Sequence, residues 1–271
     1  MKILVTHFSP DLDAIVSVWI VKRFWPGWQK AQVCFVPAGE TWKGEPVDSS
    51  PEIVHVDTGL GKFDHHHTDE DNCAAQLVLK EIKADEALER LVDVVNEIDH
   101  FREVYFPNPT ADFYDLGLVA ILDGWKLLYA EDQQKIVDLG LEGLDGIYKQ
   151  FQNKVWAERL LKEEGIEFKT KWGRAIGIET GNDEVVHTGQ KQGYVIVVRK
   201  DGKKGYVRIK SLPNPKIDLT RVAEELKKAD PQATWYLHVS KHQLLNGSTK
   251  NPKMKPTKLS LREIIEILKN V

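Results

Sequence analysis

The chain has 271 residues, and 37 Lys and Arg against 41 Asp and Glu leave a formal net charge of −4. With 42% hydrophobic and 29% charged residues, the composition is that of a soluble globular protein and excludes a disordered or fibrous one. The sequence contains no stretch approaching the roughly 20 apolar residues of a membrane span, and the two cysteines exclude a disulfide framework and favour a reducing, cytoplasmic environment. Asp11 and Asp13 lie where the apolar part of a signal peptide would begin, so we expect no export signal.

The first part of the chain predicts strands that alternate with a helix. Three short runs rich in β-branched residues predict strands, at 2–6, 32–37 and 52–57. A helical pattern covers 14–24, after the Ser-Pro-Asp turn that follows the first strand. The strands are apolar in runs instead of alternating, which is typical of a parallel sheet covered on both faces.

From 74 to about 165 the apolar pattern is almost wholly helical. Three glycines are candidate helix breaks, at Gly140, Gly143 and Gly146. The end of this region, 148–164, predicts one long helix that bridges two domains.

The last part of the chain mixes strands and helices. Runs of strand-forming residues predict strands at 194–198, 205–209 and 235–239. Asp201-Gly202 between the first two is a strong hairpin signal. A helix is expected over 218–228 with Asp218 as its N-cap, and Ser260 with Glu263 forms a capping box that opens the final helix.

These elements predict an α/β fold in three parts. We expect a parallel-sheet α/β domain over 1–145, a helical linker over 146–167, and a smaller α+β domain over 168–271. Residues 1–169 hold 17 basic and 31 acidic side chains, net −14, whereas 170–271 hold 20 and 10, net +10. An acidic domain can collect divalent metal and a basic one can hold an anionic substrate; a chance excess of solvated surface charge is the alternative.

Asp and His residues follow the predicted strands in four short fragments. The fragments are His7 to Asp13 after the first strand, Asp57 at the end of the third, Asp64-His65-His66-His67, and Asp99-His100 in the helical region. In an open α/β sheet, ligands bind beyond the carboxyl ends of the strands. We therefore expect these side chains to converge there.

The chemistry of this set points to metal. Carboxylates gathered in one place repel each other unless a cation compensates them. Imidazole and carboxylate together suit Mn²⁺, Fe²⁺, Co²⁺ or Zn²⁺ better than Ca²⁺. The number of candidate ligands favours two ions joined by one bridging carboxylate, an arrangement that can activate water for an in-line phosphoryl displacement.

Each fragment also has an ordinary structural interpretation. His7 could be a hydrogen-bonded residue after a strand, and Asp11 could only cap the next helix. Asp57 could belong to a strand-ending turn, and Asp99 could pair with Arg102. Three consecutive internal histidines are harder to explain in this way.

The run HFSPDLDA, the strand-end Asp57 and the triplet Asp64-His65-His66 resemble the motifs of the DHH phosphoesterase superfamily, in the same order. That group includes RecJ-type exonucleases, oligoribonucleases that degrade very short RNA, cyclic-dinucleotide phosphodiesterases and manganese-dependent family II pyrophosphatases. The resemblance covers residues 1–105 by motif. It implies that the domain over 1–145 is a DHH-type metal-binding domain.

The resemblance implies a role for each motif residue. His7 and Asp11 would bind a first metal ion, and Asp57 would bridge to a second. The second ion would be bound by Asp13, His65 and Asp99, with Asp93 and Asp123 as competitors for the last place. His66 would contact the substrate phosphate or assist the leaving group, so the catalytic residues would be His66 and Asp57. Asp64 would orient a histidine, His67 has no assigned role, and the expected cofactor is two divalent ions, Mn²⁺ foremost.

A segment over 237–250 resembles the region that grips substrate in the MYG-type exonuclease branch, where a His-x-Ser strand precedes a small polar loop. It has one glycine, where other branches have a glycine-rich loop with a histidine. The implied substrate contacts are His66, Ser240, Lys241, His242, Asn246, Gly247, Ser248 and Lys250. Small residues permit a close backbone approach and the polar ones offer donors to phosphate, although an ordinary polar loop on a basic surface is the alternative.

The sequence predicts a hydrolase that cleaves phosphodiester bonds of short oligonucleotides or small nucleotides with a two-metal-activated water. The alternatives are a manganese-dependent inorganic pyrophosphatase, a non-catalytic nucleotide-binding protein and a structural protein with acidic loops. Expected partners are a short nucleic acid or a small phosphorylated substrate, and no membrane. The apolar run Leu116–Leu128 is a candidate interface for a homodimer.

Overall fold

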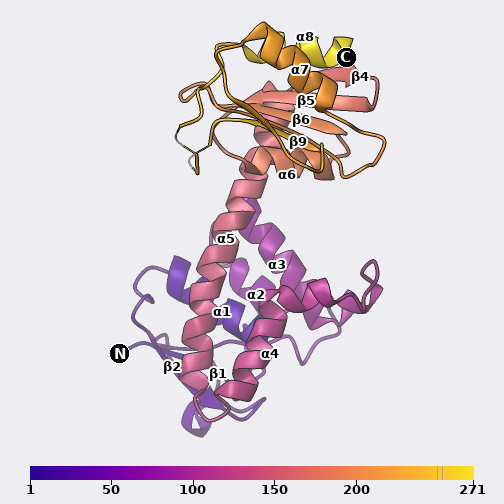
Figure 1. Ribbon diagram of the computed structural model, residues 1–271. Helices are drawn as coiled ribbons and strands as arrows, with labels where there is room; N and C mark the ends of the chain where they lie inside the picture. Colours follow the sequence, from indigo (N-terminus) through magenta and orange to yellow (C-terminus); the bar gives the residue numbers. More distant parts are fainter. Residues whose placement is uncertain (249, 252) are drawn as a thin grey trace. The chain divides into compact units, whose positions relative to one another are not determined.

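The chain folds as two units in the computed structural model, which describes residues 1–248, 250–251 and 253–271 (Figure 1). Unit 1 is Met1–Gln152 and unit 2 is Asn153–Val271. The division falls inside the long helix α5 (Gln133–Glu164), which contains most of the predicted linker 146–167.

Unit 1 contains a parallel sheet in the order β2-β1-β3. Its strands are β1 (Ile3–His7), β2 (Gln32–Val36) and β3 (Ile53–His55). In the middle of β1, Val5 pairs with Cys34 of β2 on one side and His55 of β3 on the other. The parallel sheet expected from the apolar runs is therefore confirmed, and it brings the carboxyl ends of the three strands to one edge.

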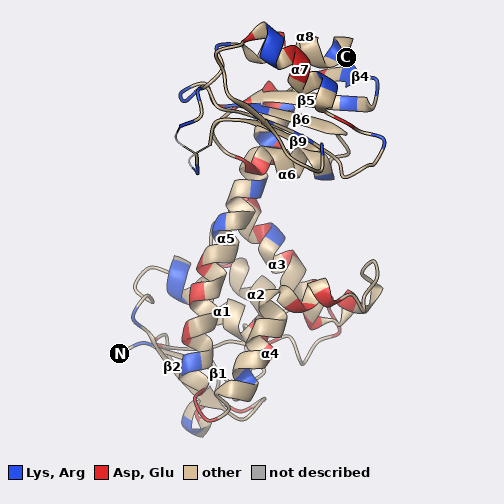
Figure 2. Cartoon of the chain, viewed as in Figure 1, with Lys and Arg blue, Asp and Glu red and all other residues tan. Residues whose placement is uncertain are grey.

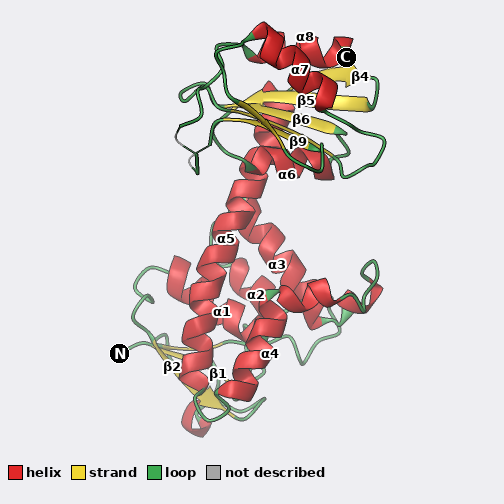
Figure 3. Cartoon of the chain, in the orientation of Figure 1, coloured by secondary structure: helices red, strands yellow, loops and turns green. Residues whose placement is uncertain are grey.

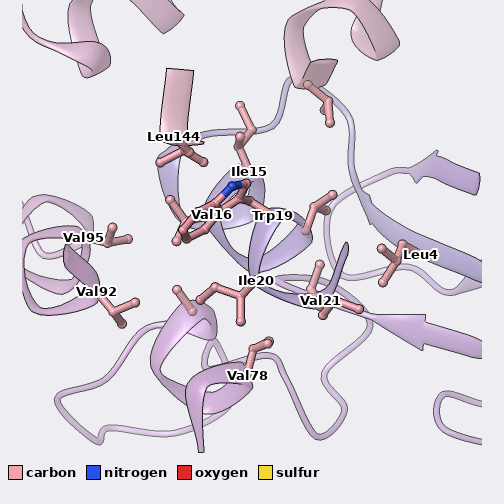
Figure 4. Packing of buried hydrophobic residues seen from close by; sticks show 14 of the residues in the cluster. Leu4, Ile15, Val16, Trp19, Ile20, Val21, Val78, Val92, Val95 and Leu144 are labelled. Carbon is pink, nitrogen blue, oxygen red and sulfur yellow. The ribbon is translucent and has the colours of Figure 1, made fainter. Parts of the chain in front are cut away.

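Helices make up most of the rest of unit 1 (Figure 3). They are α1 (Leu12–Phe24), α2 (Ala74–Leu79), α3 (Glu86–Asp99), α4 (Leu118–Leu128) and the 3₁₀ turns η1 (Trp42–Gly44), η2 (Arg102–Tyr105) and η3 (Asp112–Leu116). The core is built around α1, whose residues from Asp13 to Val21 are all buried. Figure 4 shows Ile15, Trp19 and Ile20 of α1 within this core, together with Val78 of α2 and Val92 of α3. A helix that is apolar on every side must be covered on every side, so α1 anchors the residues at its N-terminus rigidly.

The three glycines expected to break the helical region all lie inside the unbroken α5, so that prediction is wrong. Gly140 has a packing role, because a Cβ placed there would lie 2.7 Å from Ile15 Cγ2. The missing side chain lets α5 approach α1 closely. Nothing described lies within 4 Å of a Cβ built on Gly146, so it has no comparable role.

Unit 2 contains a mixed sheet in the order β4-β5-β6-β7-β9-β8, in which β5 and β6 are parallel and the other pairs antiparallel. Its strands are β4 (Ile166–Thr170), β5 (Gly173–Glu179), β6 (Ile196–Lys200), β7 (Val207–Ser211), β8 (Trp235–Leu237) and β9 (Gln243–Asn246). The Asp201-Gly202 signal is confirmed as the connection between antiparallel β6 and β7.

The helices of unit 2 are α6 (Glu184–Lys191), α7 (Thr220–Ala229) and α8 (Leu261–Asn270). The apolar stripes of α7 and α8 share one hydrophobic cluster with Ile196 and Ile209 of the sheet, and α6 shares another with Val197. The capping box that opens α8 is confirmed. Asp218 is not the N-cap of α7, which is Leu219, but its carboxylate accepts a hydrogen bond from the backbone N–H of Thr220 at 2.8 Å.

The charge of the chain is divided between the two units (Figure 2). Unit 1 holds 13 basic and 27 acidic side chains, net −14, and unit 2 holds 24 and 14, net +10. The sign change predicted from the sequence therefore coincides with a division of the fold.

Candidate metal centre

The first fragment of the site joins β1 to α1. His7 is the last residue of β1, and Asp11 is the N-cap of α1, where its Oδ1 accepts a hydrogen bond from Ala14 N at 3.0 Å. The His7 Nδ1–H donates to the carbonyl of Phe8 at 2.8 Å, which leaves Nε2 facing the site. Asp11 therefore caps the helix and still keeps a second oxygen, 3.9 Å from His7 Nε2.

Asp13 is buried in the first turn of α1 and held by the start of α2. Its two carboxylate oxygens accept hydrogen bonds from the backbone N–H groups of Ala74 and Ala75 at 2.7 and 2.8 Å. Only 1% of the residue is exposed. These bonds fix the direction of the carboxylate, and the sequence carries no signal for them because the two segments lie far apart along the chain.

Asp57 follows β3 and is 2% exposed. Its φ of 55° lies in the left-handed region, which is uncommon for a residue with a side chain. Its Oδ2 lies 3.2 Å from His7 Nε2, whereas its Oδ1 lies 3.6 Å from His65 Nε2 and 3.6 Å from His66 Nδ1. The two oxygens of one carboxylate thus face two different groups of imidazoles.

His65 completes the second group. Its Nε2 lies 3.8 Å from Asp13 Oδ2 and 3.5 Å from Asp99 Oδ2, at the end of α3. Three overlapping sets of side chains have ligand atoms within 4.8 Å of one another: His7, Asp11 and Asp57; Asp57, His65 and His66; Asp13, His65 and Asp99. The structure therefore brings together all six residues that the sequence analysis named as metal ligands.

Asp99 does not pair with Arg102, which was the alternative interpretation of this residue. Arg102 pairs with Asp71 at 2.6 Å and with Glu97 at 2.9 Å, which leaves Asp99 facing His65. The two competitors for its place, Asp93 and Asp123, belong to none of the ligand groups found among the described residues. Asp71 supports the end of α3 through Arg102.

His66 is oriented by Asp64, as the resemblance implied for one of the histidines. The His66 Nδ1–H donates to Asp64 Oδ1 at 2.8 Å, and the His66 backbone N–H donates to the same oxygen at 3.0 Å. The other oxygen of Asp64 accepts from Leu60 N at 2.7 Å. Asp64 is buried and the His66 side chain is 58% exposed, so its Nε2 can reach an incoming group. His67 is exposed and lies outside the ligand groups of the described residues.

The charges of the site depend on one another. Burial raises the pKa of Asp13 well above its ordinary value, and the charge of Asp57 raises it further. Burial also acts to raise the pKa of Asp57, but the nearby His65 imidazole and the hydrogen bond with His7 outweigh it and lower that pKa to about 2. The pKa of His65 is raised to about 9, mainly by Asp57. The pKa of His7 is also raised to about 9, because Asp57 and the Phe8 carbonyl outweigh the effect of burial. In the absence of a cation, protonated imidazoles compensate the carboxylates.

The donor set fits a transition-metal cation. Asp57 Oδ1 and His65 Nε2 are both buried, and neither has a hydrogen-bond partner within the described part of the chain. Buried polar atoms are nearly always satisfied. A cation held by nitrogen and carboxylate oxygen would satisfy both atoms and replace the protons on the imidazoles.

The predicted substrate contacts of unit 2 divide into accessible and structural ones. Ser240 is exposed and lies 2.8 Å from His238 Nδ1, and His242 is half-buried. Lys241 is exposed, and its Nζ pairs with Asp218 at 2.7 Å. These three side chains are available at the surface.

Asn246 is not accessible to a substrate, so its prediction as a substrate contact is wrong. It is fully buried, and its amide donates to the carbonyls of Thr234 and Lys255 and accepts from Thr257 N at 2.7 Å. Gly247 is also buried, and a Cβ there would lie 2.0 Å from the ring of Tyr206.

The rest of that loop is nearer the surface. Ser248 is half-buried and forms a bridge with Asn251, and Lys250 is exposed. Thr249 lies outside the described residues.

A family model described as ChrB, C-terminal domain matches residues 4–151. No curated protein matches the chain. Within the described residues, no helix is both long and apolar enough to cross a membrane.

Among solved structures, the chain is similar to a DHH domain from a member of the s1p family of ribosomal proteins, at 11% identity and a TM-score of 0.34, covering 98% of this chain and 85% of that one. It is similar to RecJ from Thermus thermophilus in complex with Mg²⁺, at 12% identity and a TM-score of 0.34, covering 99% of this chain and 49% of RecJ, about half its length. It is also similar to an exopolyphosphatase-related protein from Bacteroides fragilis, at 14% identity and a TM-score of 0.26, covering 99% and 91%. Because these TM-scores are low, the chemistry of the site is inferred from its side chains.

Proposed function

The chain belongs to the ChrB C-terminal domain family, and from the geometry of its acidic and histidine side chains we propose that it is a metal-dependent phosphoesterase of the DHH type. The observation that carries this proposal is the placement of the Asp57 carboxylate, with one oxygen toward His7 and the other toward His65. A carboxylate shared between two ligand groups is what a two-metal phosphoesterase requires. A role in solubility alone requires no buried carboxylate at all.

The ligand groups indicate which residues would hold each ion. One ion would be held by His7, Asp11 and Asp57, and the other by Asp57, Asp13, His65 and Asp99, with Mn²⁺ as the expected metal. When bound, a metal pair of this kind lowers the pKa of water and stabilises charge on phosphoryl oxygens. The chain contributes the rigid placement of Asp13 by α2 and of Asp57 by the turn after β3.

His66 has the position of a proton donor to the leaving group. Asp64 accepts from Nδ1 and holds the ring, so the exposed Nε2 can give a proton to an oxygen that leaves phosphorus. The pair therefore suits the cleavage of a diester, whose leaving oxygen needs a proton.

The substrate we propose is a short oligonucleotide or a small nucleotide diester, as in the MYG-type exonuclease branch. The net charge of +10 on unit 2 and the surface positions of Ser240, Lys241, His242 and Lys250 support an anionic substrate. Asn246 is left out because it is buried. Two alternatives, that the substrate is pyrophosphate or that the protein binds nucleotide without turnover, give different results in the test.

The test uses protein stripped of metal, reloaded with Mn²⁺ and incubated with a short end-labelled RNA. Asp57→Asn is the variant, and the exposed Asp69→Asn is the matched control. Release of mononucleotide by the parent and the control, but not by Asp57→Asn, is the expected result. If the protein cleaves only pyrophosphate, the proposed substrate is wrong and the protein is a pyrophosphatase. If it binds stoichiometric metal but releases no product from any substrate, it is a binding protein and not an enzyme.

A further inference from the structure

His100 lies beside the candidate metal centre but belongs to none of the ligand groups found among the described residues. It is the C-cap residue of α3, directly after Asp99, and its Nδ1 lies 3.8 Å from Asp99 Oδ2. The centroids of the His100 and His65 rings are 6.3 Å apart. The ring is therefore close enough to the centre to contact the sugar of a nucleotide whose phosphate is bound there.

One nitrogen of the His100 ring is fixed by the helix. Nδ1 lies 3.0 Å from the carbonyl oxygen of Asn96, one turn earlier in α3. A histidine near the end of a helix can bond one of the last carbonyls in this way. Because a carbonyl oxygen only accepts, Nδ1 carries the hydrogen and donates it. In the neutral ring Nε2 is then a hydrogen-bond acceptor.

The other nitrogen has no partner. His100 Nε2 makes no hydrogen bond in the described part of the chain, and it is not one of the buried atoms left unpaired there, so solvent reaches it. Asp71 Oδ1 lies 3.9 Å from it, beyond hydrogen-bond distance, and already accepts from Arg102 at 2.6 Å and Asn96 at 3.1 Å. Nε2 is therefore an accessible acceptor without a donor.

The charges around the ring select the kind of donor. The carboxylates of Asp71 and Asp99 lie beside its two nitrogens, and the nearby Arg102 is already engaged by Asp71 and Glu97. Carboxylates repel the oxygens of a phosphate, so the phosphate of a substrate is not bound at this place. A neutral hydroxyl can donate here without that repulsion, and a ribonucleotide carries such a group on its sugar.

We propose that His100 Nε2 accepts a hydrogen bond from the 2′-hydroxyl of the nucleotide at the metal centre, so that the site prefers RNA to DNA. This role rests on the proposed phosphoesterase function and narrows its substrate class. The 2′-hydroxyl is the group by which a protein distinguishes the two nucleic acids. A site that bonds a substrate hydroxyl discriminates against the analogue that lacks it, because the acceptor is then left unpaired.

The experiment compares trinucleotides with 2′-hydroxyl, 2′-fluoro and 2′-deoxy sugars, in an adenine and a uracil series. Fluorine replaces the hydroxyl at similar size but cannot donate a hydrogen bond. The kcat/KM for cleavage by the Mn²⁺-loaded full chain is measured, and dissociation constants are measured by fluorescence anisotropy. We expect the hydroxyl form to be preferred to the fluoro form by about 10-fold in both series, the effect of one hydrogen bond. Equal values for these two forms, or a preference that follows the base instead of the sugar, would overturn the proposal.

Three variants test His100 itself. His100→Phe keeps an aromatic ring and removes the acceptor, so the value for the hydroxyl form should fall about 10-fold, to that of the fluoro form, which should not change. His100→Gln retains an oxygen that can accept and should keep part of the preference. The exposed His187→Phe on α6 is the matched control and should keep all of it.

Elemental analysis should give the same metal content in all three variants, and circular dichroism verifies the fold. A hydroxyl preference that survives in His100→Phe would overturn the assignment. An equal loss for all three sugars would do so as well, because it would mean that the ring only supports the end of α3.

The role of His100 and the phosphoesterase function fail in different ways. If the parent cleaves all three sugars equally well, the phosphoesterase function stands and the role of His100 is wrong. If the parent releases no product from any trinucleotide, the phosphoesterase function is wrong, and the dissociation constants then decide the role of His100. Tighter binding of the hydroxyl form that is lost in His100→Phe would support that role, and equal binding of the three sugars would overturn it.

Discussion

The buried Oδ1 of Asp57 and the buried Nε2 of His65 lie 3.6 Å apart, and neither has a hydrogen-bond partner among the residues described. Leaving such a group unpaired costs roughly 1–3 kcal/mol. The φ of 55° at Asp57 adds conformational strain at the same position. A cation that binds this carboxylate is expected to recover the cost of the unbonded atoms, while the backbone strain remains.

Asp57→Asn tests the shared carboxylate without changing the backbone, because Asn tolerates the left-handed region better than Ala does. We expect the variant to lose most of its bound metal and at least about 10³-fold in rate, since metal stabilises the transition state by several kcal/mol. Metal is counted by elemental analysis and rate by the release of mononucleotide. Near-normal turnover in a folded variant would contradict the two-metal arrangement, and Asp69→Asn should match the parent.

His66→Ala separates catalysis from metal binding. The ring is 58% exposed and held by Asp64, so its loss should leave the metal content unchanged while the rate falls by about 10²–10⁴-fold, the usual contribution of general acid catalysis. Asp64→Asn should give a smaller loss, about 10–100-fold, because it only orients the ring. If His66→Ala instead removes one equivalent of metal, the roles of His65 and His66 are exchanged.

The stability of the metal-free protein is expected to fall between pH 6.5 and 9. The pKa values of His7 and His65 are raised from 6.5 to about 9, so the stability they contribute is fully present below pH 6.5 and is lost as the pH rises through 9. The raised pKa of Asp13 has the same direction, because a carboxyl that prefers its neutral form is stabilising only at low pH. Thermal melts in chelator at several pH values measure the loss.

Mn²⁺ should cancel this pH dependence, since the cation replaces the protons. His65→Gln should show a smaller loss of melting temperature than the parent over the same range. A metal-free parent whose melting temperature does not change over this range would show that the imidazoles do not compensate the carboxylates.

Gly247→Ala should destabilise unit 2 through a steric clash and not through substrate contacts. Its φ is 79°, and an added Cβ would lie 2.0 Å from Cδ1 of the Tyr206 ring. Gly193→Ala is the matched control, because its φ of 87° is similar and no described atom lies within 4 Å of its Cβ. We expect roughly 1–2 kcal/mol for Gly193→Ala from the left-handed backbone alone and about 1–3 kcal/mol more for Gly247→Ala from the clash, measured by chemical denaturation. In the double variant Gly247→Ala with Tyr206→Ala, the extra destabilisation that comes from the clash with the Tyr206 ring should disappear.

Two glycines of α5 should respond in opposite directions. Gly146→Ala adds a helix-favouring residue where nothing lies within 4 Å, and should stabilise by up to about 1 kcal/mol. Gly140→Ala places a Cβ 2.7 Å from Ile15 and should destabilise, by roughly 1–3 kcal/mol. Equal effects in denaturant unfolding would mean that α5 does not pack on α1 as closely as Gly140 indicates.

Much of unit 1 followed from local patterns. The apolar runs predicted parallel strands, and the Asp and His residues after them predicted a shared edge, because the carboxyl ends of parallel strands meet. The glycines of α5 were misread as breaks because a glycine that ends a helix and one that admits a neighbouring helix look alike in a single sequence. Asn246 was misread because burial of a polar side chain depends on partners distant in the chain.

By itself, the sequence determined the types of side chain, their order along the chain and the opposite charges of its two parts, which depend only on composition and local spacing. Only the folded chain decides the rest: Asp99 faces His65 while Arg102 pairs with Asp71, and the two oxygens of Asp57 face two different groups of imidazoles. Each of these contacts depends on which of several chemically similar side chains the fold brings within a few ångströms. The packing of whole helices determines this, and no local sequence pattern does.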